Sequence, residues 1–570
     1  MFILSVILNF KAWLADWLLV KSQLLGRKGL MVLAVLLFVI VFVRYASSVA
    51  FYQFHGTDDA YAYMVFPAKM IQTGSLGNDP FSERRMASTL GGQYFLDSFV
   101  LAGANFKNLH LIENGIGLIL FLFVLWGLLK DRKIALGFGL LIMLGAAVIP
   151  SPVGNITSFY TAAALFMALC RLLPPRQDTQ KSPWPELLIL ALLSAGACLL
   201  KSNLIAPAVV LFLAYFFLRY KDGVGPRRVL GETAFSGFLT IAFVFPWMVA
   251  MKESSDTWLY PILGVGYQGT RYGTYLSRFL EFSPYSALRL TSEFIFGLSF
   301  FIPFFLLAFI WIRSEKGRLK NAVNLMFLAA FVGFLSVIYG MGGYSMYYYS
   351  LSFLLPAFFA GLVLMFEKNE APIFSSSPLK AASAGLLFLL FIFGAYVQQD
   401  AEIFQAAKDN LNIDSGLKIG LINSDLVPPA ELKQYSALQN AVPAGAPIIA
   451  RLDRDYLFDF KRNPIIVIDF PGGASLPPGM PFKQGSNALA EYFVNLGIKY
   501  VAYSYGNQAN FSHAIGDSML RPHVNPLLRT QTEHAFDFQD NLSELYKTRK
   551  VVYDDGKNFV LDLSAATIIK

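Results

Sequence analysis

The fold is decided by the stretch LMVLAVLLFVIVFVRYASSVAFYQFHGTDDAYAY, residues 30–63. Residues 30–51 are almost uniformly apolar, and a helix needs about 20 such residues to cross a bilayer. Two adjacent carboxylates, Asp58 and Asp59, follow directly. Acidic side chains at the mouth of a span are costly unless they face water, a metal ion or a substrate. The stretch therefore predicts a membrane span that leads into a functional loop.

The composition extends this prediction to the whole chain. Of its 570 residues, 55% are hydrophobic and only 15% are charged, which is too apolar for a soluble protein. The net charge of +8 does not indicate nucleic acid, because the cations collect in short loops between apolar segments, where they orient a membrane protein. The two cysteines, Cys170 and Cys198, fall inside apolar segments and predict neither a disulfide nor a metal site.

We predict a polytopic α-helical membrane protein with about eleven spans. The predicted spans are residues 30–51, 110–129, 134–149, 156–173, 186–200, 204–218, 230–249, 291–312, 322–341, 348–366 and 381–397. Loops rich in Lys and Arg alternate with loops that lack them, and the basic loops mark the cytoplasmic side. The N-terminus is then inside, and the C-terminus and the acid pair are outside.

Three parts follow from this pattern. Residues 1–28 place their polar side chains on one stripe of a helix, as in a helix that lies in the membrane interface. A signal peptide is the alternative, but the first ten residues lack the basic start that it needs. Residues 29–397 form the transmembrane domain, with long external loops at 52–109 and 251–290, and residues 398–570 form an external soluble domain.

The soluble part has the pattern of an α/β domain. Short buried strands are predicted at 447–451, 465–469 and 499–504, with a helix at 487–496. Strands that alternate with helices imply a parallel or mixed sheet. The pair Asp555-Gly556, between two further strand-like runs, predicts a terminal hairpin.

The acid pair has a functional and a structural interpretation. Adjacent helical side chains point about 100° apart, so one carboxylate could face a reacting group while the other holds a supporting contact. Alternatively, Thr57 and Asp58 could cap a helix that begins near Ala60. Within the same loop, His55 is a further candidate for substrate contact, and Arg84 with Arg85 could meet a phosphate.

The Asp58-Asp59-Ala60-Tyr61 motif at the outer end of the first span, the long first external loop, the number of spans and the C-terminal soluble domain together resemble the GT-C superfamily of membrane glycosyltransferases. The resemblance covers the layout of the whole chain, although the motif itself is short. It implies an inverting transfer of a sugar from a polyprenyl-phosphate carrier, with an acid of this loop as general base. On that basis Asp58 is the expected base and Asp59 a supporting acid, and the order could be reversed. Many members bind a divalent cation, but no dense Asp/Glu/His cluster requires a metal here.

A phosphate leaving group needs positive charge near the outer boundary. Lys201 lies between two apolar segments on the face that otherwise has almost no cations in its short loops, so it should snorkel or hold an anion. Arg44, late in the first span, invites the same interpretation, with snorkelling as the alternative. Arg271 and Arg278 lie among Trp and Tyr residues of the second external loop, where they could pair with phosphate or belong to an interfacial aromatic helix.

We therefore expect a bacterial inner-membrane enzyme that transfers a sugar to a glycan or another envelope acceptor on the periplasmic side. A transporter or flippase of lipid-linked or small solutes would explain the spans, but it would leave the acidic loop and the external domain without a role. A non-catalytic scaffold for envelope assembly is a third hypothesis.

Overall fold

The structure is a computed structural model, and it describes the greater part of the chain. The described residues are 27–51, 58–77, 79–82, 84–85, 90–149, 156–174, 184–255, 257–259, 318–341, 347–366, 400–411, 427–469, 474–476, 478–504 and 526–566, with a few single positions between them. The predicted N-terminal interfacial helix and the predicted spans at 291–312 and 381–397 lie outside these residues.

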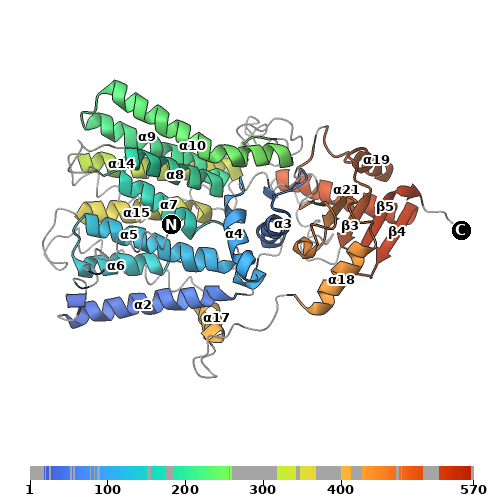
Figure 1. The fold of residues 1–570 in the computed structure, drawn as a ribbon, viewed down its shortest axis with the longest axis horizontal. Coiled ribbons are helices and arrows are strands. Elements are labelled where there is room, and N and C mark those ends of the chain that lie inside the picture. The colour runs from blue at the N-terminus through green and yellow to red at the C-terminus, as the bar shows by residue number, and fades with distance from the viewer. Residues whose placement is uncertain are drawn as a thin grey trace.

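A bundle of long apolar helices forms one half of the molecule (Figure 1). Its members are α2 (Lys28–Val49), α5 (Leu118–Asp131), α6 (Leu136–Ala147), α7 (Tyr160–Leu172), α8 (Trp184–Leu200), α9 (Ile205–Lys221), α10 (Pro226–Ser255), α14 (Arg318–Met341) and α15 (Tyr347–Phe366). Among the described residues, five helices have the length and composition of a membrane span, and four shorter apolar helices accompany them. Every predicted span that falls on described residues coincides with one of these helices.

The bundle is apolar both inside and outside. Side chains such as Phe121, Phe166 and Phe359 are buried between the helices, whereas Phe38 and Phe238 are exposed on outer faces. Helices that are apolar all round suit a lipid environment. The basic connections α5–α6 and α9–α10 lie at the end of the bundle remote from the sheet (Figure 1), as the alternation of loop charges predicts.

The first external loop folds into a layer of short helices between the bundle and the sheet (Figure 1). This layer contains η1 (Asp59–Met64), α3 (Val65–Thr73) and α4 (Gly92–Gly103), and the short helices η3 (Phe106–Asn108) and η4 (Leu111–Gly117) lead from it into the candidate span that ends with α5. Gly74, with φ of 75°, ends α3 in the left-handed conformation that glycine adopts without strain. A further helix, α17 (Asp400–Leu411), packs on the end of α2, where Asn410 donates to the carbonyls of Ala46 and Ala50.

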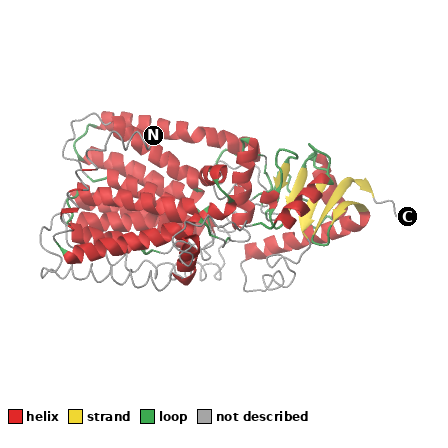
Figure 2. Ribbon diagram, turned by 60° about the horizontal axis from the view of Figure 1, so that its bottom comes forward, coloured by secondary structure: helices red, strands yellow, loops and turns green. Residues whose placement is uncertain are grey.

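The C-terminal part is an α/β domain at one end of the molecule (Figure 2). Its sheet has the order β2-β1-β3-β5-β4, with parallel pairs β1–β2 and β1–β3 and antiparallel pairs β3–β5 and β4–β5. The strands are β1 (Ile448–Arg451), β2 (Ile465–Val467), β3 (Tyr500–Ser504), β4 (Arg549–Asp554) and β5 (Asn558–Ala566), and the helices are α18 (Pro429–Asn440), α19 (Ser486–Asn495) and α21 (Pro526–Thr548). The predicted mixed sheet and terminal hairpin are confirmed.

The first external loop and the sheet share hydrophobic cores. Tyr61 and Phe66 of the loop are buried in one cluster with Leu438 and Ile448 of the C-terminal domain. Phe81 is fully buried and lies edge to face against Phe493 of α19. Because apolar burial is a main source of stability, the loop that carries the acid pair is held by the C-terminal domain as well as by the bundle.

Candidate functional site

The acid pair begins a π-helix. Asp58 is the residue before η1, and Asp59 is its first residue. Helices with this wider hydrogen-bond spacing are rare and frequently occur at functional sites. The side chain of Asp58 makes no capping hydrogen bond to the start of η1, so the structure does not show the capping role for Asp58 that the sequence left open.

Asp58 is the more accessible of the two acids and is held by an arginine. Its side chain is 30% exposed, and its Oδ1 accepts a hydrogen bond of 2.8 Å from Nε of Arg84. A charged hydrogen bond of this kind favours the ionised carboxylate. The arrangement leaves part of this carboxylate accessible beside a guanidinium.

Asp59 is fully buried and serves the local structure. Its Oδ1 accepts a hydrogen bond of 3.0 Å from the backbone N–H of Ile156. Asp59 therefore connects the first external loop to the segment that leads into α7.

Asp97 of α4 is a second buried acid close to Asp59. Its Oδ1 accepts from Gln93 at 3.1 Å, and its Oδ2 has no hydrogen-bond partner among the described residues. Burial raises the pKa of the Asp97 carboxyl well above its ordinary value, and the charges of Glu113 and Asp59 add to this effect. Burial and the two neighbouring acids therefore favour the protonated form of this carboxyl.

Lys201 lies in the break between α8 and η5 (Ser202–Leu204), outside the spans. It is 3% exposed, and its Nζ donates to Oγ1 of Thr157 at 2.6 Å. Thr157 Oγ1 also accepts from the hydroxyl of Tyr63 at 3.2 Å. Burial lowers the pKa of Lys201 to about 7, while the negative charges of Asp58 and Glu113 act in the opposite direction. The predicted cation and the predicted base therefore lie close enough for their charges to interact.

The segment before α7 joins these parts. Beyond the Asp59 and Lys201 contacts, Ser158 donates to Gln93 at 2.7 Å. Glu113 of η4 receives the backbone N–H groups of Phe159 at 2.9 Å and Thr161 at 3.1 Å. A carboxylate in this place satisfies amides at a helix start that have no partner within the helix. The segment is thereby fixed from three sides.

Arg44 is turned into the helix packing. Its Nη1 donates to the carbonyls of Ala147 and Ile149 at 2.7 and 2.8 Å, and its guanidinium lies 5.1 Å from the ring centre of Tyr160. These contacts close the end of α6 against α2, and snorkelling does not describe a side chain that is 4% exposed. The predicted substrate role of Arg44 stays a prediction.

The other predicted contacts lie outside the described residues: His55, Arg271 and Arg278. Within the described part of the chain, no three His, Cys, Asp or Glu side chains are placed to hold a metal ion. Arg84 and Lys201 supply positive charge near the two acids, and we derive no step through a metal ion.

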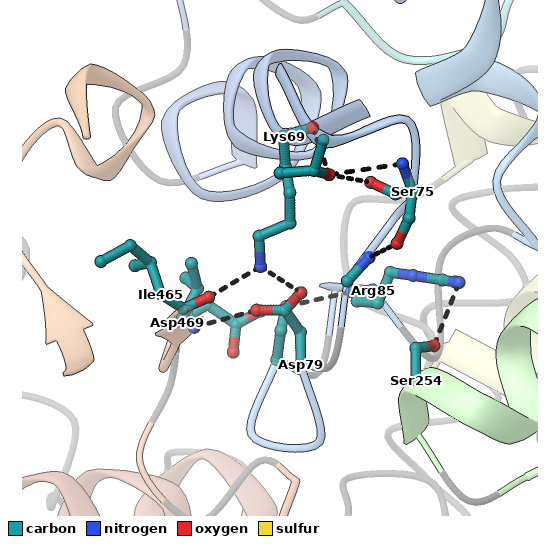
Figure 3. Close-up of polar contacts among 11 residues, drawn as sticks. Lys69, Ser75, Asp79, Arg85, Ser254, Ile465 and Asp469 are labelled. Atoms are coloured by element: carbon teal, nitrogen blue, oxygen red, sulfur yellow. Dashed lines mark hydrogen bonds and ion pairs between the residues drawn. The ribbon is translucent and has the colours of Figure 1, made fainter. Parts of the chain in front are cut away.

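A buried ion pair docks the external domain on the loop. Nζ of Lys69 lies 2.7 Å from Oδ2 of Asp79 and 2.8 Å from the carbonyl of Ile465 on β2 (Figure 3). Oδ1 of Asp79 accepts from the backbone N–H of Val467 at 3.0 Å. The contacts of Asp79 are those of a docking residue.

Arg85 anchors the other side of the loop. It is fully buried, and its Nη2 donates to Oγ of Ser254 at the end of α10, at 3.3 Å (Figure 3). Arg84 and Arg85 are therefore neighbours in sequence with different tasks, because Arg84 pairs with Asp58 and Arg85 holds the bundle.

The sequence interpretation missed Thr157 and Tyr63 as partners of the site. The polar pair Thr157-Ser158, placed directly before an apolar helix, was the available signal. Tyr63 was visible only as part of the Asp-Asp-Ala-Tyr-Ala-Tyr run. Their common contact spans 94 positions of the chain, a separation that local patterns do not encode.

No protein-family model matches the chain, and no curated protein matches it significantly. Among solved structures it is similar to apo ArnT from Cupriavidus metallidurans, with 12% identity, a TM-score of 0.47, and coverage of 93% of this chain and 97% of ArnT. The undecaprenyl phosphate complex of the same protein gives 11% identity, a TM-score of 0.43, and coverage of 94% and 97%.

A further similar structure is the archaeal oligosaccharyltransferase AglB from Archaeoglobus fulgidus, in complex with an inhibitory peptide and a dolichol-phosphate. It shares 12% identity with a TM-score of 0.38, over 83% of this chain and 69% of AglB. The roles of individual residues rest on the contacts described above.

Proposed function

We propose that the protein is an integral-membrane glycosyltransferase that moves a sugar from a polyprenyl-phosphate donor to an acceptor on the outer side of the membrane. One observation carries the proposal. A partly exposed, arginine-paired carboxylate, Asp58, and a buried cation, Lys201, are brought together where the apolar bundle meets the external domain. A base and a counter-charge for phosphate are the two groups that this transfer needs.

The reaction would be a single displacement. Asp58 accepts the proton of the acceptor hydroxyl while the hydroxyl oxygen bonds to the anomeric carbon of the donor. The bond from this carbon to the phosphate oxygen breaks, and its electron pair leaves with the polyprenyl phosphate. Because the acceptor enters opposite the leaving group, the anomeric configuration inverts.

The geometry supports Asp58 rather than Asp59 as the base. A general base must come within about 2.6–3.2 Å of the hydroxyl that it deprotonates, and Asp58 has 30% of its side chain exposed. Asp59 is fully buried and accepts the N–H of Ile156. Asp59 then acts as the supporting acid that holds the segment of Thr157 in place.

Lys201 would stabilise the leaving phosphate. A buried ammonium group next to a hydroxyl can donate to phosphate oxygens as charge develops on them. Thr157, which holds Lys201, would fix its direction. Arg271 and Arg278 of the second external loop remain candidates for further phosphate contacts.

The setting follows from the arrangement of charges. The basic connections lie at the end of the bundle opposite the site (Figure 1), so the positive-inside rule favours a site on the outer side. In a bacterium this is the periplasmic side of the inner membrane, where the acceptor would be a glycan or another envelope molecule.

The test is turnover by the purified full-length protein with a panel of polyprenyl-phosphate sugars. We expect activity in the wild type, and a fall in kcat of about 10²- to 10⁴-fold for Asp58→Asn, the range that a general base supplies. Asp59→Asn should lose activity together with stability, because it weakens the acceptor for Ile156.

Asp131→Asn is a matched control. Asp131 is 48% exposed and also pairs with an arginine, Arg171, at 2.7 Å. This variant loses the same kind of ion pair away from the site and should keep wild-type kcat. Full activity of a folded Asp58→Asn would contradict the role of Asp58. Movement of donor without bond cleavage would favour a flippase, and a protein inert to every donor would favour a scaffold.

A further inference from the structure

Asp469, at the end of β2, reaches out of the external domain to the loop that carries the acid pair. It is fully buried, and its Oδ2 accepts from Oγ of Ser82 at 2.9 Å and from the backbone N–H of Arg84 at 2.8 Å. Nη1 of Arg84 lies 3.7 Å from the same oxygen. This one carboxylate oxygen therefore accepts hydrogen bonds from Ser82 and Arg84 and also faces the guanidinium of Arg84.

Arg84 contacts the proposed base as well as Asp469. Its Nε donates to Oδ1 of Asp58 at 2.8 Å. Its backbone is held from the second side as well, because its carbonyl accepts the hydroxyl of Tyr94 at 3.1 Å. The result is a row of alternating charges, Asp469, Arg84 and Asp58, in which the external domain supplies the outermost member.

We propose that Asp469 is a positioning residue for the transfer reaction, through which the external domain sets the place and the charge state of Asp58 by way of Arg84. This rests on the proposed function, since it assigns a task to the base of that reaction. Asp469 touches neither donor nor acceptor in this role. Its effect runs through Ser82 and Arg84.

The distribution of contacts separates this role from simple docking. The external domain is docked on the loop at two other places. One is the Lys69–Asp79 pair. The other is Gln72, whose Nε2 donates to the carbonyl of Phe458 at 3.2 Å and whose Oε1 accepts the N–H of Phe460 at 2.8 Å. Neither of these contacts includes Arg84. The residues that dock the external domain therefore differ from Asp469, which contacts Ser82 and Arg84.

Loss of Asp469 should change the reaction in a recognisable way. Without the acceptor, Arg84 and its guanidinium shift away from Asp58, and a displacement of about 1 Å can lower a rate by about 100-fold. A carboxylate that loses a neighbouring cation is protonated at higher pH. Loss of the Asp469 charge itself acts in the opposite direction, and Lys201 still faces Asp58, so the acidic limb of the kcat/KM profile should move up by no more than about 1 pH unit. A merely structural residue would not move it.

The experiment compares Asp469→Ala with Gln72→Ala in the full-length protein, using the polyprenyl-phosphate sugar that the wild type turns over. Both variants remove hydrogen bonds between the same two parts of the chain, so both should lower the thermal unfolding temperature. Only Asp469→Ala should lower kcat, by about tenfold or more, and move the acidic limb. Asp469→Asn keeps an acceptor oxygen for Ser82 and Arg84, and it should recover part of the activity.

A double-mutant cycle with Arg84→Ala tests the route. If Asp469 acts through the guanidinium, Asp469→Ala should have almost no further effect on kcat in the Arg84→Ala background. Additive losses, or a kcat and pH profile of Asp469→Ala equal to those of Gln72→Ala, would overturn the inference while leaving the glycosyltransferase function standing. If Asp469→Ala does not fold, Asp469→Asn serves in the cycle. A wild type without turnover would overturn both.

Discussion

The charge of Lys201 should make donor affinity fall as the pH rises. The pKa of this group is lowered to about 7 by burial, so the ammonium form gives way to the neutral amine within the physiological range. The phosphodiester of a polyprenyl-phosphate sugar keeps its single negative charge over the same range. The pH dependence of donor binding therefore reflects the protonation of Lys201. Because the ammonium form binds the phosphate, donor affinity is present below pH 7 and is lost above it.

The magnitude can be worked from the one-proton equilibrium. If only the ammonium form binds phosphate, the donor KM should rise by about 30-fold between pH 6 and pH 8.5. Replacement of the ammonium group removes a charged hydrogen bond, which contributes about 1.5–3 kcal/mol. Lys201→Met should therefore raise KM at pH 6 by about 10- to 100-fold and leave it independent of pH.

The assay is the initial rate as a function of donor concentration, at fixed acceptor concentration, in buffers from pH 6 to pH 8.5. Lys201→Arg is the matched control, because a guanidinium keeps its proton throughout this range, so its KM should stay flat. A wild-type KM that does not change with pH, or a Lys201→Arg variant with the wild-type slope, would refute the proposed phosphate role of Lys201.

Two further predictions concern the external domain. Asp79→Asn leaves the buried Lys69 ammonium without its ion partner, so the free energy of unfolding should fall by about 3–5 kcal/mol; faster hydrogen exchange in β2 would reveal this, and unchanged exchange would contradict it. Burial raises the pKa of the Asp455 carboxyl to about 8, so the native state holds a proton that the unfolded state releases above its ordinary pKa. Stability should fall as the pH rises from about 4 to about 8, and the unfolding temperature of Asp455→Asn should show a smaller slope.

The fold was predictable where the signal is local. The terminal hairpin shows both strand runs around Asp555-Gly556, and Gly556 takes the positive φ of 78° that such a turn requires. The helix α21 was missed, although Phe538, Leu542 and Leu545 repeat at helical spacing and are all buried. The pattern that indicates this helix is therefore present in the sequence.

The candidate residues could be chosen from the sequence, but their contacts could not. The cost of placing Asp58, Asp59 and Lys201 near a bilayer is a property of single residues, and it made all three candidates. The partners that fix their roles come from remote segments: Ile156 is 97 positions from Asp59. Such contacts depend on the packing of whole helices, which no short pattern encodes.

The pairing of the first external loop with the external domain has a consequence for biosynthesis. The hydrogen bond between Arg84 and Asp469 joins positions 385 residues apart, and at about 5–20 residues per second the ribosome needs about 20–80 s to make the chain between them. During this interval the nascent chain lacks both the Asp469 carboxylate that contacts Arg84 and the β2 carbonyl that accepts from Lys69. A chain that stops before β2 would carry the described helices of the bundle without these two contacts, so on the proposed role of Asp469 it would position Asp58 less well than the full chain does.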